Sequence, residues 1–138
     1  MGVASGLVFA NLGSAYGMAK SGVGIASLGV IDSSKIFKAL IPIIMAGILG
    51  IYGLIVSVLL QGKAGRTDLT MADGYKYLAS GLCCGLSSLA SGLAIGVAGD
   101  AGVRAYAQTD AIFVGMVLIM IFAEAIGLYG MIVAIILS

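Results

Sequence analysis

Long apolar stretches leave this chain few ways to fold in water. Hydrophobic residues make up 61% of the sequence, charged residues make up 9%, and the mean hydropathy is +1.18. A typical soluble domain is about a quarter charged, so this chain lacks the polar surface that such a domain needs. We therefore expect an integral membrane protein, in which apolar stretches of about 18 residues or more span the bilayer as helices.

Four such spans fit into the 138 residues. The expected spanning helices are residues 1–28, 39–60, 77–99 and 111–137, joined by polar links at 29–38, 61–76 and 100–110. The predicted fold is an all-α, four-helix antiparallel transmembrane bundle. No basic flank precedes the first apolar stretch, so we do not expect a cleaved signal peptide.

The chain contains an internal repeat of a helical hairpin. Residues 52–56, YGLIV, align with residues 129–133, YGMIV, at a shift of 77, and small residues of the first span align with those of the third at a shift of 75. We therefore expect a first hairpin at 1–60 and a second at 77–138. Because each unit has two spans, both enter the membrane in the same direction.

The first and third spans each carry small residues along one helical face, at spacings of 3 and 4. In lipid, small residues let two backbones approach closely and gain dispersion contacts. One interpretation is a tight helix pair inside a bundle, and another is a pair of helices that lines the narrow inside of a ring. The residues assigned to ring packing are Gly13, Gly17, Gly24, Gly85, Gly92, Gly96 and Gly99.

Glu124 is the only acidic residue inside an expected span, because all five Asp residues lie in the links. Its aligned position in the first hairpin is Gly47. A charged acid at the bilayer centre costs about 2.5–3.5 kcal/mol on insertion scales. Glu124 is therefore expected to stay neutral against lipid and to lose its proton when water or a cation comes near, which suits reversible proton carriage. A packing role for a neutral, hydrogen-bonded acid is the alternative.

A proton fits this acid better than sodium does, and no metal site is expected. A hard cation needs several oxygen ligands, and the helical face around Glu124 carries no other side-chain oxygen. The remaining oxygens at membrane depth belong to Tyr52, Tyr129, Ser57, Ser87, Ser88, Ser91 and Asn11. Such a set can hold a neutral carboxyl through one or two hydrogen bonds but is too poor to replace the hydration shell of sodium.

Four stretches of sequence carry a family resemblance. They are GSAYGMAKSGVGI (13–25), IPIIMAGILGIYGLIVSVL (41–59), GLAIGVAGDAGVRA (92–105) and FVGMVLIMIFAEAIGLYGMIVAIIL (113–137). Together they closely resemble the proteolipid, or c-type, subunits of vacuolar-type proton ATPases. Members of that family usually carry a further stretch before the first helix, so the sequence is expected to be either a trimmed or a short member.

The resemblance implies a membrane rotor ring, with the first and third helices inside and the second and fourth outside. It implies that Glu124 is the proton-carrying acid and that Tyr52 contacts it from the second helix. The implied partners are further proteolipid subunits, identical or paralogous, an a-type membrane subunit that supplies an arginine and two aqueous half-channels, and a central-stalk subunit. ATP hydrolysis is implied for a separate soluble sector, so we expect neither catalytic residues nor a cofactor in this chain.

The resemblance also implies a location in an acidic endomembrane, such as that of the vacuole, lysosome, endosome or Golgi. It places the links at 29–38 and 100–110 in the cytosol and both termini in the lumen. The basic residues are too evenly divided between the two sides for the positive-inside rule to orient the chain.

Other functional classes fit part of the pattern. A small multidrug antiporter also has four helices and one buried glutamate, but aromatic residues should line its site for an organic cation, and this chain has no Trp. A channel-forming proteolipid without an ATPase partner is the other alternative. Carbodiimide labelling of Glu124 together with loss of ATP-driven pumping would separate the pump from that channel. The net charge of +1 argues against a nucleic-acid partner.

Overall fold

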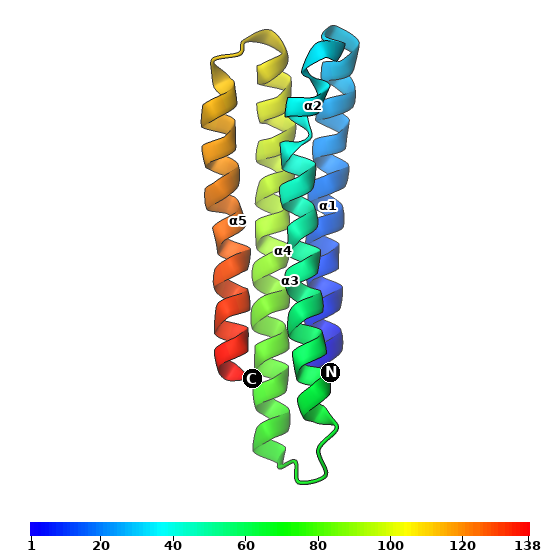
Figure 1. The fold of residues 1–138 in the computed structure, drawn as a ribbon, viewed down its shortest axis with the longest axis vertical. Coiled ribbons are helices and arrows are strands. Elements are labelled where there is room, and N and C mark those ends of the chain that lie inside the picture. The colour runs from blue at the N-terminus through cyan, green and yellow to red at the C-terminus, as the bar shows by residue number, and fades with distance from the viewer.

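The computed structural model describes residues 1–138 as four long helices packed side by side (Figure 1). The elements are α1 Gly2–Ile31, the 3₁₀ turn η1 Ser33–Lys35, α2 Ile36–Ala39, α3 Ile41–Ala64, α4 Met71–Gln108 and α5 Ile112–Leu137. Helices α1 and α4 run in one direction and α3 and α5 in the other, and both termini lie toward the same end (Figure 1). The predicted all-α antiparallel bundle is confirmed.

Local sequence signals set the helix ends. The Asp32 side chain accepts a hydrogen bond from the backbone N–H of Ser34 at 3.1 Å, which closes the turn after α1. Pro42 lies in the first turn of α3, where its missing N–H leaves no intrahelical bond unmade. Thr70 and Asp73 form a reciprocal capping box at the start of α4. These signals therefore stop and start the chain at the two ends of the bundle.

The helices are longer than the apolar spans. Helix α4 covers Met71–Gln108, beyond the expected 77–99 at both ends, so Asp73 and Asp100 are helical residues. The link between α3 and α4 shortens to residues 65–70. Hydropathy marks only the apolar part of a helix, and the polar turns at its ends continue into the aqueous region.

Three segments are long and apolar enough to cross a membrane on length and composition alone: Ser33–Ala64, Met71–Gln108 and Ile112–Leu137. Helix α1, the expected first span, does not reach that standard. Glycine and serine residues occupy much of its length, and Asn11 and Lys20 lower its hydropathy further. Because α1 packs along α4 and α3, its small residues face protein and need not be apolar.

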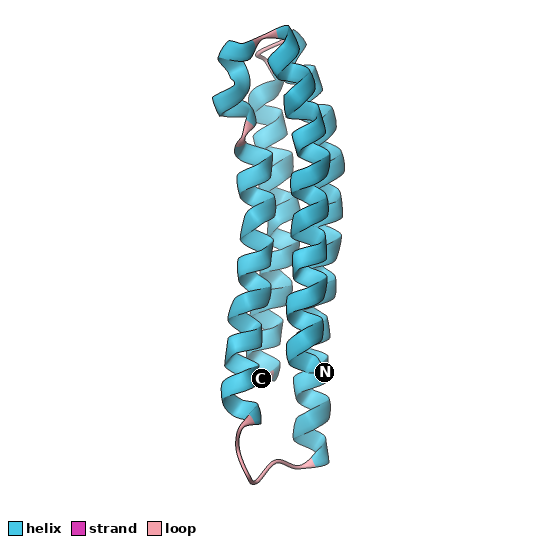
Figure 2. Ribbon diagram, turned by 90° about the vertical axis from the view of Figure 1, so that its right-hand side faces the viewer, coloured by secondary structure: helices cyan, strands magenta, loops and turns pink.

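The bundle has two layers, with α1 beside α4 and α3 beside α5, as Figure 2 shows. The contact between α1 and α4 depends on missing side chains. A Cβ on Gly13 would lie 2.5 Å from the carbonyl oxygen of Ser88, and a Cβ on Gly92 would collide with the Gly13 backbone. At these positions the two backbones touch, which is the close approach that small residues permit in lipid.

The structure places all seven glycines assigned to ring packing at helix contacts inside the chain. All seven lie where α1 and α4 meet, with Gly24 against Asp100 and Gly99 against Ser21, and Gly99 also faces Pro42 of α3. The first interpretation, a tight helix pair, therefore describes what they do within one copy. Their part in packing a ring remains a prediction.

Serine hydroxyls join the two layers at one end of the bundle. Ser57 donates to the carbonyl oxygen of Val3 at 2.8 Å, and Ser80 donates to the carbonyl oxygen of Ala134 at 2.6 Å. The first bond ties α3 to α1, and the second ties α4 to α5. Each hairpin thus has a hydrogen bond between its own two helices near this end of the bundle.

We expect the substitution Gly92→Ala to destabilise the bundle by about 1–3 kcal/mol, because its methyl group has no space against Gly13. Thermal unfolding of the purified protein in detergent measures the effect. Gly115→Ala is the matched control, since a Cβ there meets nothing within 4 Å, and it should leave the melting temperature unchanged or raised. Equal melting temperatures for the two variants would contradict the tight contact of α1 with α4.

Candidate functional site

Glu124 lies midway along α5, a helix with no other charged residue. Its side chain is half-buried, and both carboxyl oxygens are buried without a hydrogen-bond partner in the chain. None of the four ion pairs of the chain includes it. Glu124 is thus a carboxyl group held away from solvent with its polar atoms unpaired.

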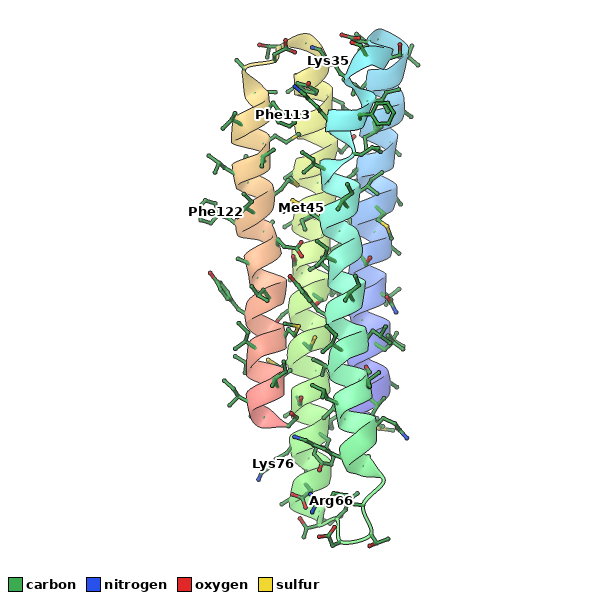
Figure 3. All side chains as sticks on the ribbon, in the orientation of Figure 1. Lys35, Met45, Arg66, Lys76, Phe113 and Phe122 are labelled. Carbon is green, nitrogen blue, oxygen red and sulfur yellow. The ribbon has the colours of Figure 1, made fainter.

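Most charged side chains lie toward the two ends of the bundle, away from the middle of α5. Figure 3 shows Lys35 at one end and Arg66 and Lys76 at the other. At the first end, Lys35 pairs with Asp110 at 2.7 Å, and its ammonium lies 4.9 Å from the centre of the Tyr106 ring. These contacts hold the 29–38 and 100–110 segments together and leave no counter-charge for Glu124.

Tyr52 is the predicted partner that the structure brings to Glu124. Its side chain extends from α3 and approaches the carboxyl group, yet the contact lacks the geometry of a hydrogen bond. Tyr52 therefore lies next to the acid without forming a hydrogen bond to it.

The surroundings of Glu124 are apolar. A cluster that joins α3, α4 and α5 contains Ala46, Leu49, Ile95, Met120 and Ala123, with Met45, Tyr52 and Ala98 packed against it. Leu49 also lies over α5 one turn from the acid, with its Cδ2 atom 2.5 Å from the position of a Cβ on Gly127. An ionised carboxylate without a partner is costly in such surroundings, so the neutral acid is the form that this arrangement accommodates.

The serine hydroxyls of α4 near the acid form other bonds or lack a partner. Ser91 donates to the backbone carbonyl oxygen of Ala123 at 2.6 Å, and Ser88 has a buried hydroxyl oxygen with no partner. The bond from Ser91 fixes α5 to α4 at the residue before Glu124. Ser87, Ser88 and Ser91 all lie at membrane depth, and no pattern in the sequence separates the three. Ser91 is thus a positioning residue that the sequence did not reveal.

Comparison with known proteins adds a family to this geometry. The sequence matches the family described as the C subunit of ATP synthase over residues 1–60 and 78–137. It is 56% identical over 140 residues to the c-type 16 kDa proteolipid of the V-type proton ATPase of Ascaris suum, a match that covers all of this chain and 87% of the relative. The chain belongs to the c-type proteolipid family of V-type proton ATPases.

Relatives from other organisms agree. The V-type proton ATPase 16 kDa proteolipid subunit of Chrysotila carterae is 54% identical over 143 residues, covering all of this chain and 87% of the relative. The c-type 16 kDa proteolipid of the V-type proton ATPase of Homo sapiens is 53% identical over 138 residues, covering all of this chain and 88% of the relative. Membership in this family favours the ring proteolipid over the antiporter and the independent channel.

Proposed function

We propose that this chain is a proton-translocating subunit of the rotor ring in the membrane sector of a V-type ATPase. The observation that carries the proposal is the Glu124 carboxyl, buried at mid-helix with both oxygens unpaired, in a chain whose relatives are named as proteolipid subunits of proton ATPases. These relatives are subunits of an ATPase and not its catalytic part. We accordingly assign no catalytic residue and no cofactor to this chain.

Proton release requires a partner outside the chain. We assign this role to an a-type membrane subunit that presents an arginine next to the ring and opens two aqueous half-channels. A unit charge about 4 Å from another gains roughly 4 kcal/mol at an effective dielectric constant near 20. That gain exceeds the cost of about 2.5–3.5 kcal/mol for charging an acid at the bilayer centre, so Glu124 ionises beside the arginine and is neutral elsewhere.

The attraction to the arginine and the cost of a charge in lipid together restrict how the ring can rotate. An ionised Glu124 that left the arginine for lipid would lose the attraction and keep the cost of its charge, so an empty site stays at the partner. Once a proton arrives from the second half-channel, the neutral acid can travel through lipid with the turning ring. ATP hydrolysis in the soluble sector supplies the torque through a central-stalk subunit.

Tyr52 steadies the loaded state in this scheme. A tyrosine hydroxyl can donate to a neutral acid or accept from it, and Tyr52 approaches Glu124 from the neighbouring helix α3. The bond holds the carboxyl against α3 during the passage through lipid. Next to the arginine the carboxyl can turn outward, because the present contact is not a formed hydrogen bond.

Glycine at position 47 sets the number of protons carried. The first hairpin has no acid at the place that matches Glu124, so one copy carries one proton for four helices. A ring with a given number of helices then moves fewer protons per turn than a ring with an acid in every hairpin. Each proton receives more of the hydrolysis energy, which favours building a steep gradient.

The proposed setting is an acidic endomembrane, such as that of the vacuole, lysosome, endosome or Golgi. The chain would cross it four times, with the small-residue face of α1 packed on α4 and α3. The segments 29–38 and 100–110, which include the helix ends at that side of the bundle, would face the cytosol and both termini the lumen. The cytosolic end then carries the paired Lys20, Asp100 and Arg104 side chains toward the stalk.

Replacing the acid tests the function directly. In membranes whose own proteolipid is replaced by this chain, Glu124→Gln should abolish ATP-driven acidification, because an amide cannot release a proton. Glu124→Asp should retain partial activity at best, since its carboxyl is one methylene short of the same position. Quenching of a pH-sensitive dye in sealed vesicles measures both variants. Acidification by Glu124→Gln at the wild-type rate would refute the proposal.

Removing one hydroxyl tests the role of Tyr52. A single hydrogen bond contributes about 0.5–1.5 kcal/mol, so Tyr52→Phe should lower the acidification rate by roughly twofold to tenfold and leave the assembled ring intact. Tyr75→Phe is the control, because Tyr75 is exposed in the first turns of α4 and should pump at the wild-type rate. A Tyr52→Phe variant that pumps as fast as this control would show that the hydroxyl takes no part.

A further inference from the structure

Contacts within the two hairpins repeat at a shift of 77 residues for both helices, two more than the shift of 75 that aligns the small residues of the first and third spans. A Cβ on Gly50 would lie 3.5 Å from the hydroxyl oxygen of Ser14, and a Cβ on Gly127 would lie 3.5 Å from that of Ser91. Each residue of the second contact is the matching residue of the first plus 77. The close contact of α3 with α1 at Gly50 is therefore repeated by α5 and α4 at Gly127.

A second contact agrees one turn further along. A Cβ on Gly53 would lie 2.8 Å from the carbonyl oxygen of Gly6, and a Cβ on Gly130 would lie 3.0 Å from that of Cys83. These residues are again 77 apart. Any surface on the second hairpin therefore has a counterpart on the first at the same depth in the bundle.

The second hairpin receives α3 on the face that carries the acid. Leu49 packs onto Gly127, with its Cδ2 atom 2.5 Å from the Cβ position, and Tyr52 approaches Glu124. The first hairpin thus places Leu49 and Tyr52 of α3 against the matching face of the second. This contact joins the two units of the tandem repeat.

The first hairpin has the same face, and no part of the chain covers it. The counterparts of Glu124 and Gly127 are Gly47 and Gly50, and they line a groove of about 390 Å³ between α1 and α3. A Cβ on Gly47 would meet only the sulfur atom of Met18, at 4.0 Å. A side chain from outside the chain can therefore enter at Gly47 without displacing anything.

The side chain of Asn11 is a polar group in this groove that has no hydrogen-bond partner within the chain. It lines the groove, with its Oδ1 atom 2.7 Å from the position of a Cβ on Gly50. The side-chain hydrogen bonds between elements come from serine, cysteine and lysine residues, and none involves Asn11. An amide at membrane depth without a partner is unfavourable, so the occupant of the groove should offer a hydrogen bond.

Helix α5 carries the counterpart of the α3 side chains on its free face. Adding 77 to Leu49 and Tyr52 gives Ile126 and Tyr129, whose side chains are 45% and 63% exposed. Phe122, the counterpart of Met45 of α3, is 73% exposed and points away from the bundle in Figure 3. This apolar face with one hydroxyl has no partner within the chain.

We propose that the α5 face of a second copy of this chain fills the groove, with its Ile126 on Gly50 and its Tyr129 hydroxyl hydrogen-bonded to the amide of Asn11. The proposal rests on the ring proposed above and specifies the joint between neighbouring copies. It repeats between copies the contact that joins the two hairpins within one. At this second joint Gly47 supplies no carboxyl, and the tyrosine bonds an amide instead.

A lipid chain is the rival occupant, and two features favour the second copy. A hydrocarbon tail cannot satisfy Asn11, whereas a tyrosine hydroxyl can both donate and accept. The α5 face also has the same spacing of side chains as the α3 face, which already fits the matching groove on the second hairpin. The groove therefore matches a shape and a polar group that this chain itself carries.

Cysteine cross-linking in assembled membranes tests the joint. In a background of Cys83→Ala and Cys84→Ala, the pair Gly50→Cys with Ile126→Cys should give a ladder of linked copies on treatment with a short bifunctional thiol reagent. A Cβ at Gly50 meets Asn11 only at the flexible end of its side chain, so the cysteine can be accommodated. Denaturing gel electrophoresis shows the ladder.

Two matched pairs control for reagent and position. Leu49→Cys with Gly127→Cys should link within one copy and give no ladder, because these residues touch in the chain. Gly50→Cys with Val114→Cys should not link, although Val114 is 67% exposed on α5, because it lies about three turns from Ile126. Absence of a ladder for Gly50 with Ile126, or an equal ladder for Gly50 with Val114, would overturn the joint.

Acidification assays separate this proposal from the function. Adding Glu124→Gln to the Gly50–Ile126 pair should stop pumping and leave the ladder unchanged. A variant pair that pumps but gives no ladder would overturn the joint and leave the function standing. A ladder in membranes where the chain with Glu124 intact never pumps would support the joint and overturn the function.

The hydrogen bond itself is tested by a double-mutant cycle. Asn11→Leu and Tyr129→Phe should each lower the yield of intact rings in detergent by about twofold to fivefold, and the double variant should lose no more than either single one. Tyr75→Phe is the control and should give the wild-type yield. Losses that multiply in the double variant would show that the two groups do not share a bond.

Discussion

A carboxylate cannot stay ionised in hydrocarbon unless another charge or water compensates it, and the surroundings of Glu124 follow from that constraint. Within the chain the acid has apolar neighbours, no counter-ion and no completed hydrogen bond. The chain therefore holds a proton well and cannot release it alone. A partner has to promote the release of the proton. The protonation state of Glu124 therefore depends on the position of the copy relative to that partner. A buried cation beside Glu124 within the chain would remove this dependence.

The backbone packing serves the same end. Because α1 and α4 touch through glycine at positions such as Gly13 and Gly92, the layer that they form is narrow, and α3 and α5 pack against each other over it. That closeness brings Tyr52 of one hairpin to Glu124 of the other. The bond from Ser91 of α4 to the Ala123 carbonyl of α5 then fixes the position of Glu124 along the bundle relative to α4. Proton carriage thus depends on residues that never touch the proton.

The sequence could predict the parts of this account that depend on composition and repetition. Apolar stretches predicted the helices, and the isolation of Glu124 predicted its importance. Helix α1 was predicted as an apolar span, yet its hydropathy is low. Its glycine face packs against protein and not against lipid, so it does not have to be apolar. The helical turns beyond the spans were missed because polar residues continue a helix into water. The hydrogen bond from Ser91 to Ala123 could not be predicted, because Ser87, Ser88 and Ser91 lie close together on one helix. Only the packing of α4 against α5 determines which of the three side chains faces α5.

The most direct test of the central claim is the protonation state of Glu124 in the assembled ring. Isotope-edited infrared spectroscopy of the ring in lipid vesicles, without the a-type membrane partner, distinguishes the carbonyl band of a protonated acid from the bands of a carboxylate. The account predicts a protonated carbonyl band at neutral pH that disappears in Glu124→Gln and gives way to a carboxylate only where the arginine-bearing partner is present. A carboxylate signal from Glu124 at every accessible pH in lipid alone would contradict the account.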